Sequence, residues 1–298
     1  MKSNQRGRIQ VIISAICFGT LPLLTQIGLT GGGNIISILA YRFSIAALLL
    51  WGYIWINKIK VNVTAKQVRL FALMAFFGYG LMSFGYFQAL KYIPSYMTVM
   101  LFFTYPIIVT ILSYFLLDSP ITKMKLLILV TVSIGIFLIS WGQLSFQPMG
   151  IVLALLAALF YGVYIIFLGS SHTKHLRPEV LMAFVILFCA IFYIGLGAFT
   201  GQLTLAINST GWISIIVMAL FSTVLAMLLF YVGIQNVGPS TAAIISTVEP
   251  ITAFMLGVVV LGESVDLMKL VGALLILVGV VYIKMPQRRK KIDWKARV

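Results

Sequence analysis

Residues 238–263, GPSTAAIISTVEPITAFMLGVVVLGE, form an apolar run with Glu249 and Pro250 near its middle. The run is long enough to cross a hydrocarbon core of about 30 Å as a helix, which takes roughly 20 residues. Such runs are common in this chain of 298 residues, of which 61% are hydrophobic and 9% charged, with a mean hydropathy of +1.10. This composition makes a water-soluble enzyme implausible and predicts an integral membrane protein.

Ten apolar runs of this kind follow one another, separated by short breaks. Backbone polar groups in lipid must be satisfied within one segment, and the runs are too long and too uniformly apolar for barrel strands, so we predict helices. The first run follows three basic residues but has no clear cleavage site, and we interpret it as an uncleaved helix. The predicted spans are 9–29, 34–57, 67–90, 93–117, 123–141, 149–169, 178–199, 211–234, 239–261 and 267–285.

The basic residues predict how these spans are oriented. With both termini in the cytoplasm, 18 of the 21 Lys and Arg residues fall in cytoplasmic segments, only Lys91 and Lys269 fall outside, and Arg42 lies within a span. This distribution follows the positive-inside rule. The net charge of +15 therefore reports orientation, and the basic tail 284–298 is expected to contact anionic lipid rather than nucleic acid.

The second half of the chain repeats the first. The stretch 93–117, IPSYMTVMLFFTYPIIVTILSYFLL, aligns with the opening run so that Pro106 matches Pro250, and offsets of 143 to 145 hold along the chain. Five spans then match five, which predicts two repeats, 1–142 and 143–298. Because five is odd, the repeats have opposite orientations in the membrane, as in carriers that alternate between outward-open and inward-open states. A duplication kept for packing in a channel or membrane enzyme is the alternative.

Four stretches together resemble one known family. They are FGTLP at 18–22, LAYRFSIAALLL at 39–50, ALKYIPSYMTVMLFFTYPIIVTILS at 89–113 and the opening run, and they are similar to the EamA-like family of the drug/metabolite transporter superfamily. The resemblance implies a ten-helix inverted-repeat carrier, typically a bacterial inner-membrane exporter of amino acids or other small metabolites. It also implies a central cavity lined largely by the first, third, fourth, sixth, eighth and ninth helices. Phe18 stands where the family often has tryptophan, which leaves a substrate contact there open.

Glu249 is an acidic residue near the middle of a predicted span. It lies ten residues into the ninth span, about 15 Å from the cytoplasmic end, and its side chain is too short to reach the surface. Pro250 removes a backbone donor, so we expect a kink that frees the carbonyl of Ser246, which shares a helix face with Glu249. Burial disfavours a charged carboxylate, so Glu249 is a candidate for proton coupling or for binding a substrate amine. A structural ion pair is the alternative; the repeat mate of Glu249 is Tyr105.

Arg42 is a basic residue well inside a predicted span. It lies eight residues into the second span, about 12 Å from the external end, and its repeat mate lies near Leu187. Two interpretations stay open. Arg42 is either a structural anchor that reaches toward the headgroups or a helix C-terminus, or a clamp for a substrate carboxylate in the bidentate geometry that Arg favours.

Polar and aromatic stripes supply the other candidates for a binding site. Hydroxyl and aromatic side chains recur at three- and four-residue spacing on the third, fourth and sixth spans, and two hydroxyls lie on the eighth. For each of them, ordinary packing in a membrane bundle is the alternative. Besides Glu249, Ser246 and Arg42, the predicted substrate-binding residues are Tyr79, Ser83, Tyr86, Thr98, Phe102, Tyr105, Tyr161, Tyr164, Ser222 and Thr223, with Pro106 and Pro250 as hinges.

The sequence thus predicts an all-α secondary transporter that exports a small amphipathic metabolite, such as an amino acid, by alternating access. A multidrug or hydrophobic-cation exporter, a channel, and a membrane-embedded lipid-modifying enzyme with Glu263 and Asp266 at one interface are the alternatives. We expect no catalytic residue, no cofactor and no metal, because His172 and His175 have no evident third ligand. The expected partners are the solute and the lipid bilayer, with the protein a monomer or homodimer.

Overall fold

The computed structural model describes residues 2–93, 95–139, 147–170, 173, 176–262 and 265–282. Over these residues the regular secondary structure is helical and contains no β-strand. Eight helical runs are long and apolar enough to cross a membrane. The basic tail 284–298, His172, His175 and Glu263 lie outside the described residues.

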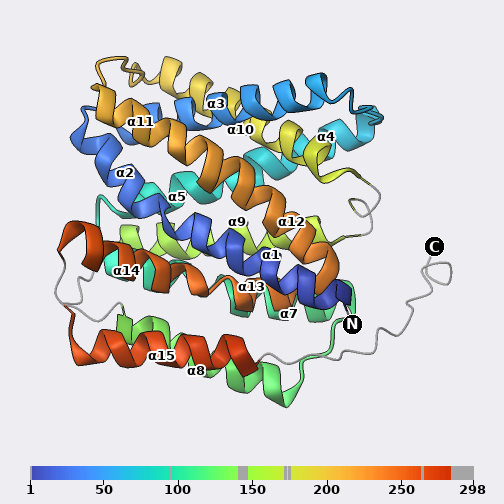
Figure 1. Ribbon diagram of the computed structural model, residues 1–298, viewed down its shortest axis with the longest axis vertical. Helices are drawn as coiled ribbons and strands as arrows, with labels where there is room; N and C mark the ends of the chain where they lie inside the picture. The colour runs from blue at the N-terminus through green and yellow to red at the C-terminus, as the bar shows by residue number, and fades with distance from the viewer. Residues whose placement is uncertain are drawn as a thin grey trace.

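Helices occupy each of the ten predicted spans wherever the chain is described (Figure 1). The two shortest spans, α8 and α15, have 17 and 16 residues. The helices are α1 (Lys2–Gly19), α2 (Leu21–Thr30), α3 (Ile35–Ile56), α4 (Ala65–Leu73), η1 (Met74–Gly80), α5 (Leu81–Ala89), α6 (Ser95–Phe102), α7 (Tyr105–Leu117), α8 (Lys123–Ile139), α9 (Pro148–Gly169), α10 (Pro178–Phe199), α11 (Ser209–Val217), η2 (Met218–Leu225), α12 (Ala226–Val237), α13 (Pro239–Ile245), α14 (Val248–Leu261) and α15 (Leu267–Tyr282).

Three of the predicted spans break near their middle, each beside a proline. α2 begins one residue before Pro22, α7 one residue before Pro106, and α14 two residues before Pro250. Proline lacks the N–H that would continue the helical hydrogen bonds, so the chain turns before it. The expected kink at Pro250 is confirmed, but the expectation of a free Ser246 carbonyl is wrong. Its oxygen accepts a hydrogen bond from the Glu249 N–H at 2.9 Å, because the turn tightens around it.

Two π-helical segments, η1 and η2, occupy the same place in the third and eighth spans, with their first residues, Met74 and Met218, 144 positions apart. In η1 the backbone of Gly80 lies close to the carbonyl of Ala75. A Cβ on Gly80 would lie 2.6 Å from that carbonyl oxygen, which explains a glycine at this position. Tyr193 on α10 donates to the Gly80 carbonyl at 2.8 Å. In η2, Thr223 donates to the Met218 carbonyl at 3.0 Å. Segments of this kind are frequent at functional sites.

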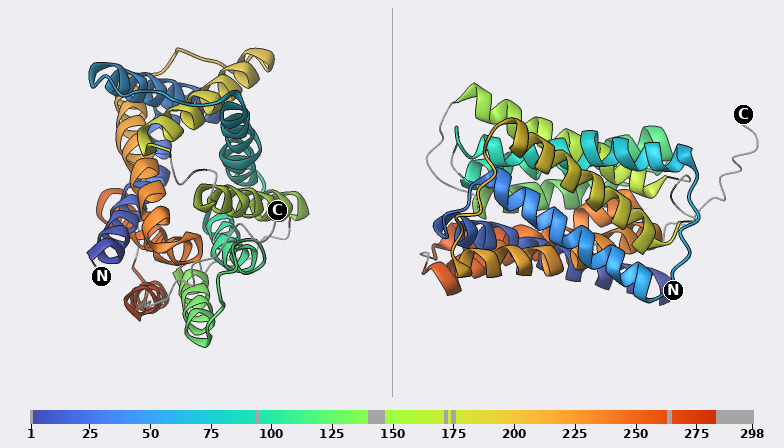
Figure 2. Two further views of the ribbon diagram at one scale, coloured as in Figure 1. Left: turned by 90° about the vertical axis from the view of Figure 1, so that its right-hand side faces the viewer. Right: turned by 90° about the horizontal axis from the view of Figure 1, so that it is seen from above.

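The packing of the helices follows the repeat. α3 packs along α10, and α8 along α15, so that each pair joins equivalent spans of the two halves. α1 packs along α12 in the same way as α9 packs along α5. Viewed along the helices, α8 and α15 lie side by side at one edge of the bundle (Figure 2). The start of α1 and the end of α15 lie at the same end of the bundle (Figure 1).

The contact between α8 and α15 depends on glycine. A Cβ on Gly272 would lie 2.6 Å from the carbonyl oxygen of Gly135 and 2.8 Å from the backbone nitrogen of Ile139. Backbone atoms cannot move aside as a flexible side chain can, so small residues are needed for this approach. Gly279 also lies close to α8, since a Cβ there would lie 2.6 Å from the Cγ2 atom of the Val132 side chain.

We expect Gly272→Val to separate these helices and to destabilise the protein by about 1–3 kcal/mol, the usual range for overpacking. The melting temperature of the purified protein in detergent measures this. Gly195→Ala is the matched control, because a Cβ on Gly195 meets no atom within 4 Å. Its melting temperature should stay the same or rise slightly, since alanine favours the helix over glycine. Equal melting temperatures for wild type and Gly272→Val would contradict the expectation.

Candidate functional site

A cleft of about 240 Å³ opens at one end of the bundle, between α3, α5 and α10. We call this the cleft end; it holds the turn at 31–34 and the segment 200–208. Polar side chains from Asn34, Gln88, Lys91 and Gln202 rim the cleft, and Leu39, Phe84 and Tyr193 are among the residues that line it. A polar rim over an apolar wall is the form of a site for a small amphipathic solute.

The opposite end, which holds the start of α1 and the link from α3 to α4, is closed by hydrogen bonds between helices; we call it the closed end. The Tyr231 hydroxyl on α12 donates to the carbonyl of Thr173, and the Gln235 amide donates to the carbonyl of Leu168. Thr173 is fully buried. These bonds tie α12 to α9 and to the turn that follows it.

Replacing Tyr231 with Phe should loosen the closed end. Loss of one buried hydrogen bond, about 1 kcal/mol, would favour opening about fivefold. A cysteine at Ser113, buried on α7 near this end, provides the reporter, and its labelling by a small maleimide should quicken. Tyr282→Phe, which removes the hydroxyl of an exposed tyrosine on α15, is the control and should leave the labelling rate unchanged. A similar rate in both variants would show that the Tyr231 bond does not hold this end closed.

The fourth and ninth spans meet only in one half. α7 packs against α13, where Tyr105 and Ser246 share a hydrogen bond of 2.7 Å and Thr110 and Ser240 one of 3.0 Å. We call this contact the closed seam. Their other halves, α6 and α14, form no comparable contact. Because α7·α13 and α6·α14 are equivalent pairs of the two repeats, the molecule is open toward the cleft end and closed toward the other.

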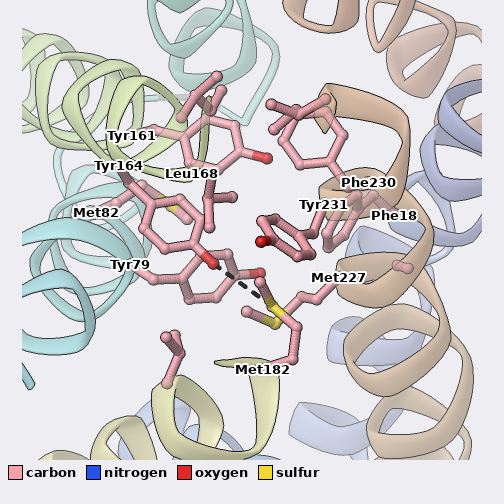
Figure 3. Packing of buried hydrophobic residues seen from close by; sticks show 14 of the residues in the cluster. Phe18, Tyr79, Met82, Tyr161, Tyr164, Leu168, Met182, Met227, Phe230 and Tyr231 are labelled. Carbon is pink, nitrogen blue, oxygen red and sulfur yellow. Dashed lines mark hydrogen bonds between the residues drawn. The ribbon is translucent and has the colours of Figure 1, made fainter. Parts of the chain in front are cut away.

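Aromatic side chains fill the middle of the bundle. Tyr79, Tyr161 and Tyr164 lie on one wall, and Phe18, Phe230 and Tyr231 face them from the other (Figure 3). Phe102 joins this cluster, with its ring centroid 5.5 Å from Tyr161, 5.1 Å from Tyr86 and 5.3 Å from Tyr105. The hydroxyl of Tyr79 points into the space between the walls, the hydroxyl of Tyr164 donates to the sulfur of Met182 (Figure 3), and that of Tyr231 donates to the Thr173 carbonyl. The predicted aromatic candidates therefore gather at one place.

Glu249 lies in the first turn of α14 and borders this aromatic cluster. Its carboxylate acts electrostatically on the phenols of Tyr79, Tyr86, Tyr105 and Tyr161. Among the described residues it has no ion-pair partner and no side-chain hydrogen bond. Although Glu249 lies deep in the bundle, part of its surface stays accessible. A carboxylate in this position is available to bind a cation or a proton.

Arg42 is 1% exposed on α3, so it does not reach the membrane surface as an anchor would. Its guanidinium lies near Tyr79, Tyr193 and Cys189 and over the ring of Phe43, 4.4 Å from the centroid. Its Nε has no hydrogen-bond partner, and within the described chain no carboxylate lies at ion-pair distance. A buried guanidinium with an unused donor is prepared for an anion, since Arg binds carboxylates through two parallel N–H donors.

Arg42 and Glu249 do not form an ion pair with each other. Tyr79 lies near both of them. The site thus has a cation on α3 and an anion on α14, each near Tyr79.

The remaining candidates fall into two groups. Ser83 is buried on α5, and Ser222 shares a hydrogen bond of 2.7 Å with Thr20, at the break between α1 and α2. Thr98 is buried on α6, and Thr223 bonds within its own π-helical segment. The Ser222 hydroxyl thus bonds to a side chain of another helix, whereas the Thr223 hydroxyl bonds to the backbone of its own segment.

Sequence reasoning missed three side chains of the site: Thr20, Tyr193 and Phe230. Tyr193 stacks on Phe43, with centroids 5.6 Å apart and rings 5° from parallel, beside Arg42. Phe230 stacks on Tyr161 at 6.3 Å. Thr20 lies within the FGTLP stretch, so the family motif was a usable signal for it. The chain offers no comparable pattern for Tyr193.

The sequence model of the EamA-like transporter family matches the chain twice, over residues 5–141 and 148–285. The chain belongs to this family. The resemblance of the four stretches is thereby confirmed. Each half of the chain carries one copy of the family's unit, in keeping with the repeated helix pattern. The protein is therefore a multi-pass membrane transporter.

Similar proteins are also named as transporters. An uncharacterized transporter of Bacillus subtilis, YetK, is 25% identical over 247 residues, which cover 80% of this chain and 75% of the relative. An uncharacterized transporter of Archaeoglobus fulgidus is 23% identical over 278 residues, which cover 92% and 94%. One protein of known crystal structure superposes with a TM-score of 0.79 at 17% identity, over 93% of this chain and 95% of that one. That likeness concerns the fold alone.

Proposed function

We propose that the protein is a secondary active transporter that exports a small amphipathic metabolite, an amino acid or a related compound, across the bacterial cytoplasmic membrane by alternating access. One observation carries this proposal: the buried Arg42 and the partly accessible Glu249 lie deep in the bundle, each near Tyr79, and do not pair with each other. Arg42 would hold the carboxylate and Glu249 the amine of the solute, while the tyrosines contact its apolar part. Such a pair of charges is costly in a membrane unless a ligand uses it.

The proposed topology has ten transmembrane helices, including α8 and α15, in two inverted five-helix repeats, 1–142 and 143–298, with both termini in the cytoplasm. The distribution of Lys and Arg supports this, since 18 of the 21 lie on that side. The cleft end then faces outward, and the closed end faces the cytoplasm. This arrangement is the outward-open state of a carrier that works as a monomer or homodimer in the bilayer.

Proton coupling through Glu249 is part of the proposal. A carboxyl group that is partly accessible, and that has no ion pair or side-chain hydrogen bond among the described residues, can exchange a proton when the solute is absent. Antiport of a proton against the solute would use the inward proton gradient to drive export. Pro106 and Pro250 would serve as hinges, because both spans already turn beside them.

Flux into proteoliposomes tests the proposal with matched solutes: an amino acid, the amine that lacks its carboxylate, and the acid that lacks its amine. We expect saturable flux of the amino acid and much slower flux of both analogues. Equal flux of the amine would instead favour a hydrophobic-cation exporter, which the single acidic residue near the aromatic cluster also permits. Flux no faster than in empty liposomes for every solute of a broad panel would refute transport.

A further inference from the structure

The two repeats place different residues at one equivalent position. Tyr105 directly precedes Pro106, as Glu249 directly precedes Pro250. In the closed seam, Tyr105 shares its hydrogen bond with Ser246, which stands four residues before Pro250. The residue four before Pro106 is Phe102. The repeat equivalent of the Tyr105–Ser246 contact is therefore a contact between Glu249 and Phe102.

The two members of this equivalent pair have different surroundings at present. Tyr105 is 0% exposed and Ser246 is 2% exposed within the seam. Glu249 keeps part of its surface accessible, and among the described residues α14 and α6 do not pack together as α13 and α7 do. An exchange of conformations between the repeats would close α6 on α14. Glu249 would then be enclosed on the side that faces α6, as Tyr105 is enclosed here on the side that faces α13.

In that position Glu249 would face Phe102. Phe102 is 6% exposed and makes ring contacts with Tyr86, Tyr105 and Tyr161, and its side chain has no hydrogen-bonding group. Tyr105 has the Ser246 hydroxyl to satisfy its own, but Glu249 has no such partner across the seam. An ionised carboxylate does not tolerate enclosure of this kind and becomes neutral instead.

We propose that the cleft end closes only when Glu249 is neutral, so that this carboxyl group controls the conformational exchange. A proton, or a cationic group of the solute, neutralises it and permits closure. The empty, ionised carrier stays open toward the cleft. The inference rests on the proposed transport function and adds a rule for coupling: a carrier that holds neither a proton nor a cationic solute does not return, so it does not leak.

The other titratable groups near Glu249 do not account for such a switch. Those facing it are the phenols of Tyr79, Tyr86, Tyr105 and Tyr161, which ordinarily lose their protons only near pH 10. Of the elements packed against α14, helix α2 carries no ionisable side chain, and α1, α8 and α15 carry no carboxylate or histidine. Cys17 on α1 and Lys125 and Lys269 near the ends of α8 and α15 are not among the groups that act on the carboxyl.

Labelling of two reporter cysteines by a small maleimide tests the proposal in the absence of any solute. Gln88→Cys lines the cleft and reports its opening, and Ser113→Cys reports opening of the closed end. The native Cys17 and Cys189 are buried, and the protein without a reporter gives the blank. Each rate is divided by the rate of the same reporter in Glu249→Gln at the same pH, which cancels the ionisation of the thiol itself.

For Gln88→Cys we expect a ratio near one at acid pH that rises severalfold at alkaline pH. For Ser113→Cys we expect a ratio near one at acid pH that falls severalfold at alkaline pH. Glu249→Asp should keep the pH response. Phe102→Ser supplies a hydroxyl opposite Glu249, so the closed state tolerates the ionised carboxylate and the alkaline rise of the Gln88→Cys ratio becomes smaller. Phe102→Leu is the matched control and should keep the full rise. A ratio that does not depend on pH, or equal responses of Phe102→Ser and Phe102→Leu, would overturn the proposal.

The outcome is separate from that of the proposed function. A pH-dependent ratio without flux of any solute would keep the switch and reject the transporter assignment to small metabolites. Solute flux with a ratio that stays at one would keep the transporter and reject the switch.

Discussion

Glu249→Gln is expected to abolish export of the solute, or to leave a residual flux that no longer depends on pH. Glutamine keeps the size and the hydrogen-bonding capacity of the side chain but carries neither a charge for the amine nor an exchangeable proton. Wild-type flux should vary with pH across the range in which the carboxyl group exchanges its proton. Reconstituted proteoliposomes with a fixed solute gradient and a varied pH give this profile.

Glu249→Asp is the matched variant for this experiment, because it keeps the carboxyl group and moves it by one methylene. We expect reduced flux with the pH dependence retained. The melting temperature should change little in Glu249→Gln, since the side chain has no ion pair among the described residues to lose. A Glu249→Gln protein with wild-type flux, affinity and pH profile would exclude this residue from the mechanism.

The positions of most helices were predictable because the membrane requires each of them to be an apolar run of a fixed minimum length. A helix must be apolar over the hydrocarbon thickness, so the runs in the sequence locate the helices to within a few residues at most of their ends. The prolines also predicted the breaks in the fourth and ninth spans, since each lacks a donor. The repeat offset, read from Pro106 and Pro250, holds in the structure for features that the sequence did not show, such as η1 and η2.

The π-helical segments themselves were not predictable from the pattern. A π-helical turn changes the register by one residue, and the apolar composition of residues 74–80 and 218–225 is equally compatible with an α-helix. Tyr193 from another helix donates to the Gly80 carbonyl, and Thr223 donates to the Met218 carbonyl from within η2. Sequence spacing does not show a long-range partner such as Tyr193.

The sequence predicted which residues form the candidate site better than it predicted what each side chain does there. Tyr79, Tyr105, Tyr161 and Phe102 gather as expected, because stripes on several helices can only face a common centre. The choice between anchor and clamp for Arg42 stayed open in the sequence, since a span position fixes depth but not the direction of a long side chain. The enclosure of Arg42 beside Tyr193 removes the surface-anchor interpretation.

Arg42→Met is expected to raise the melting temperature and to weaken transport together. A buried guanidinium without a carboxylate partner destabilises the folded protein, and replacing buried charges with apolar side chains of similar size is often stabilising by about 1–4 kcal/mol. Loss of a charge-assisted contact to the solute should cost about 3 kcal/mol, or about a hundredfold in apparent affinity for a carboxylate-bearing solute. Thermal unfolding in detergent and flux as a function of solute concentration measure the two effects.

Arg42→Lys separates charge from geometry. Lysine keeps the positive charge but lacks the planar pair of donors, so an intermediate affinity is expected, and the analogue without a carboxylate should be carried equally by wild type and both variants. Opposite signs of the stability and transport effects in Arg42→Met are what distinguish a binding residue from a structural one. If Arg42 only supported the packing of α3 on α10, the melting temperature and the flux would fall together, and the loss of flux would be the same for solutes with and without a carboxylate.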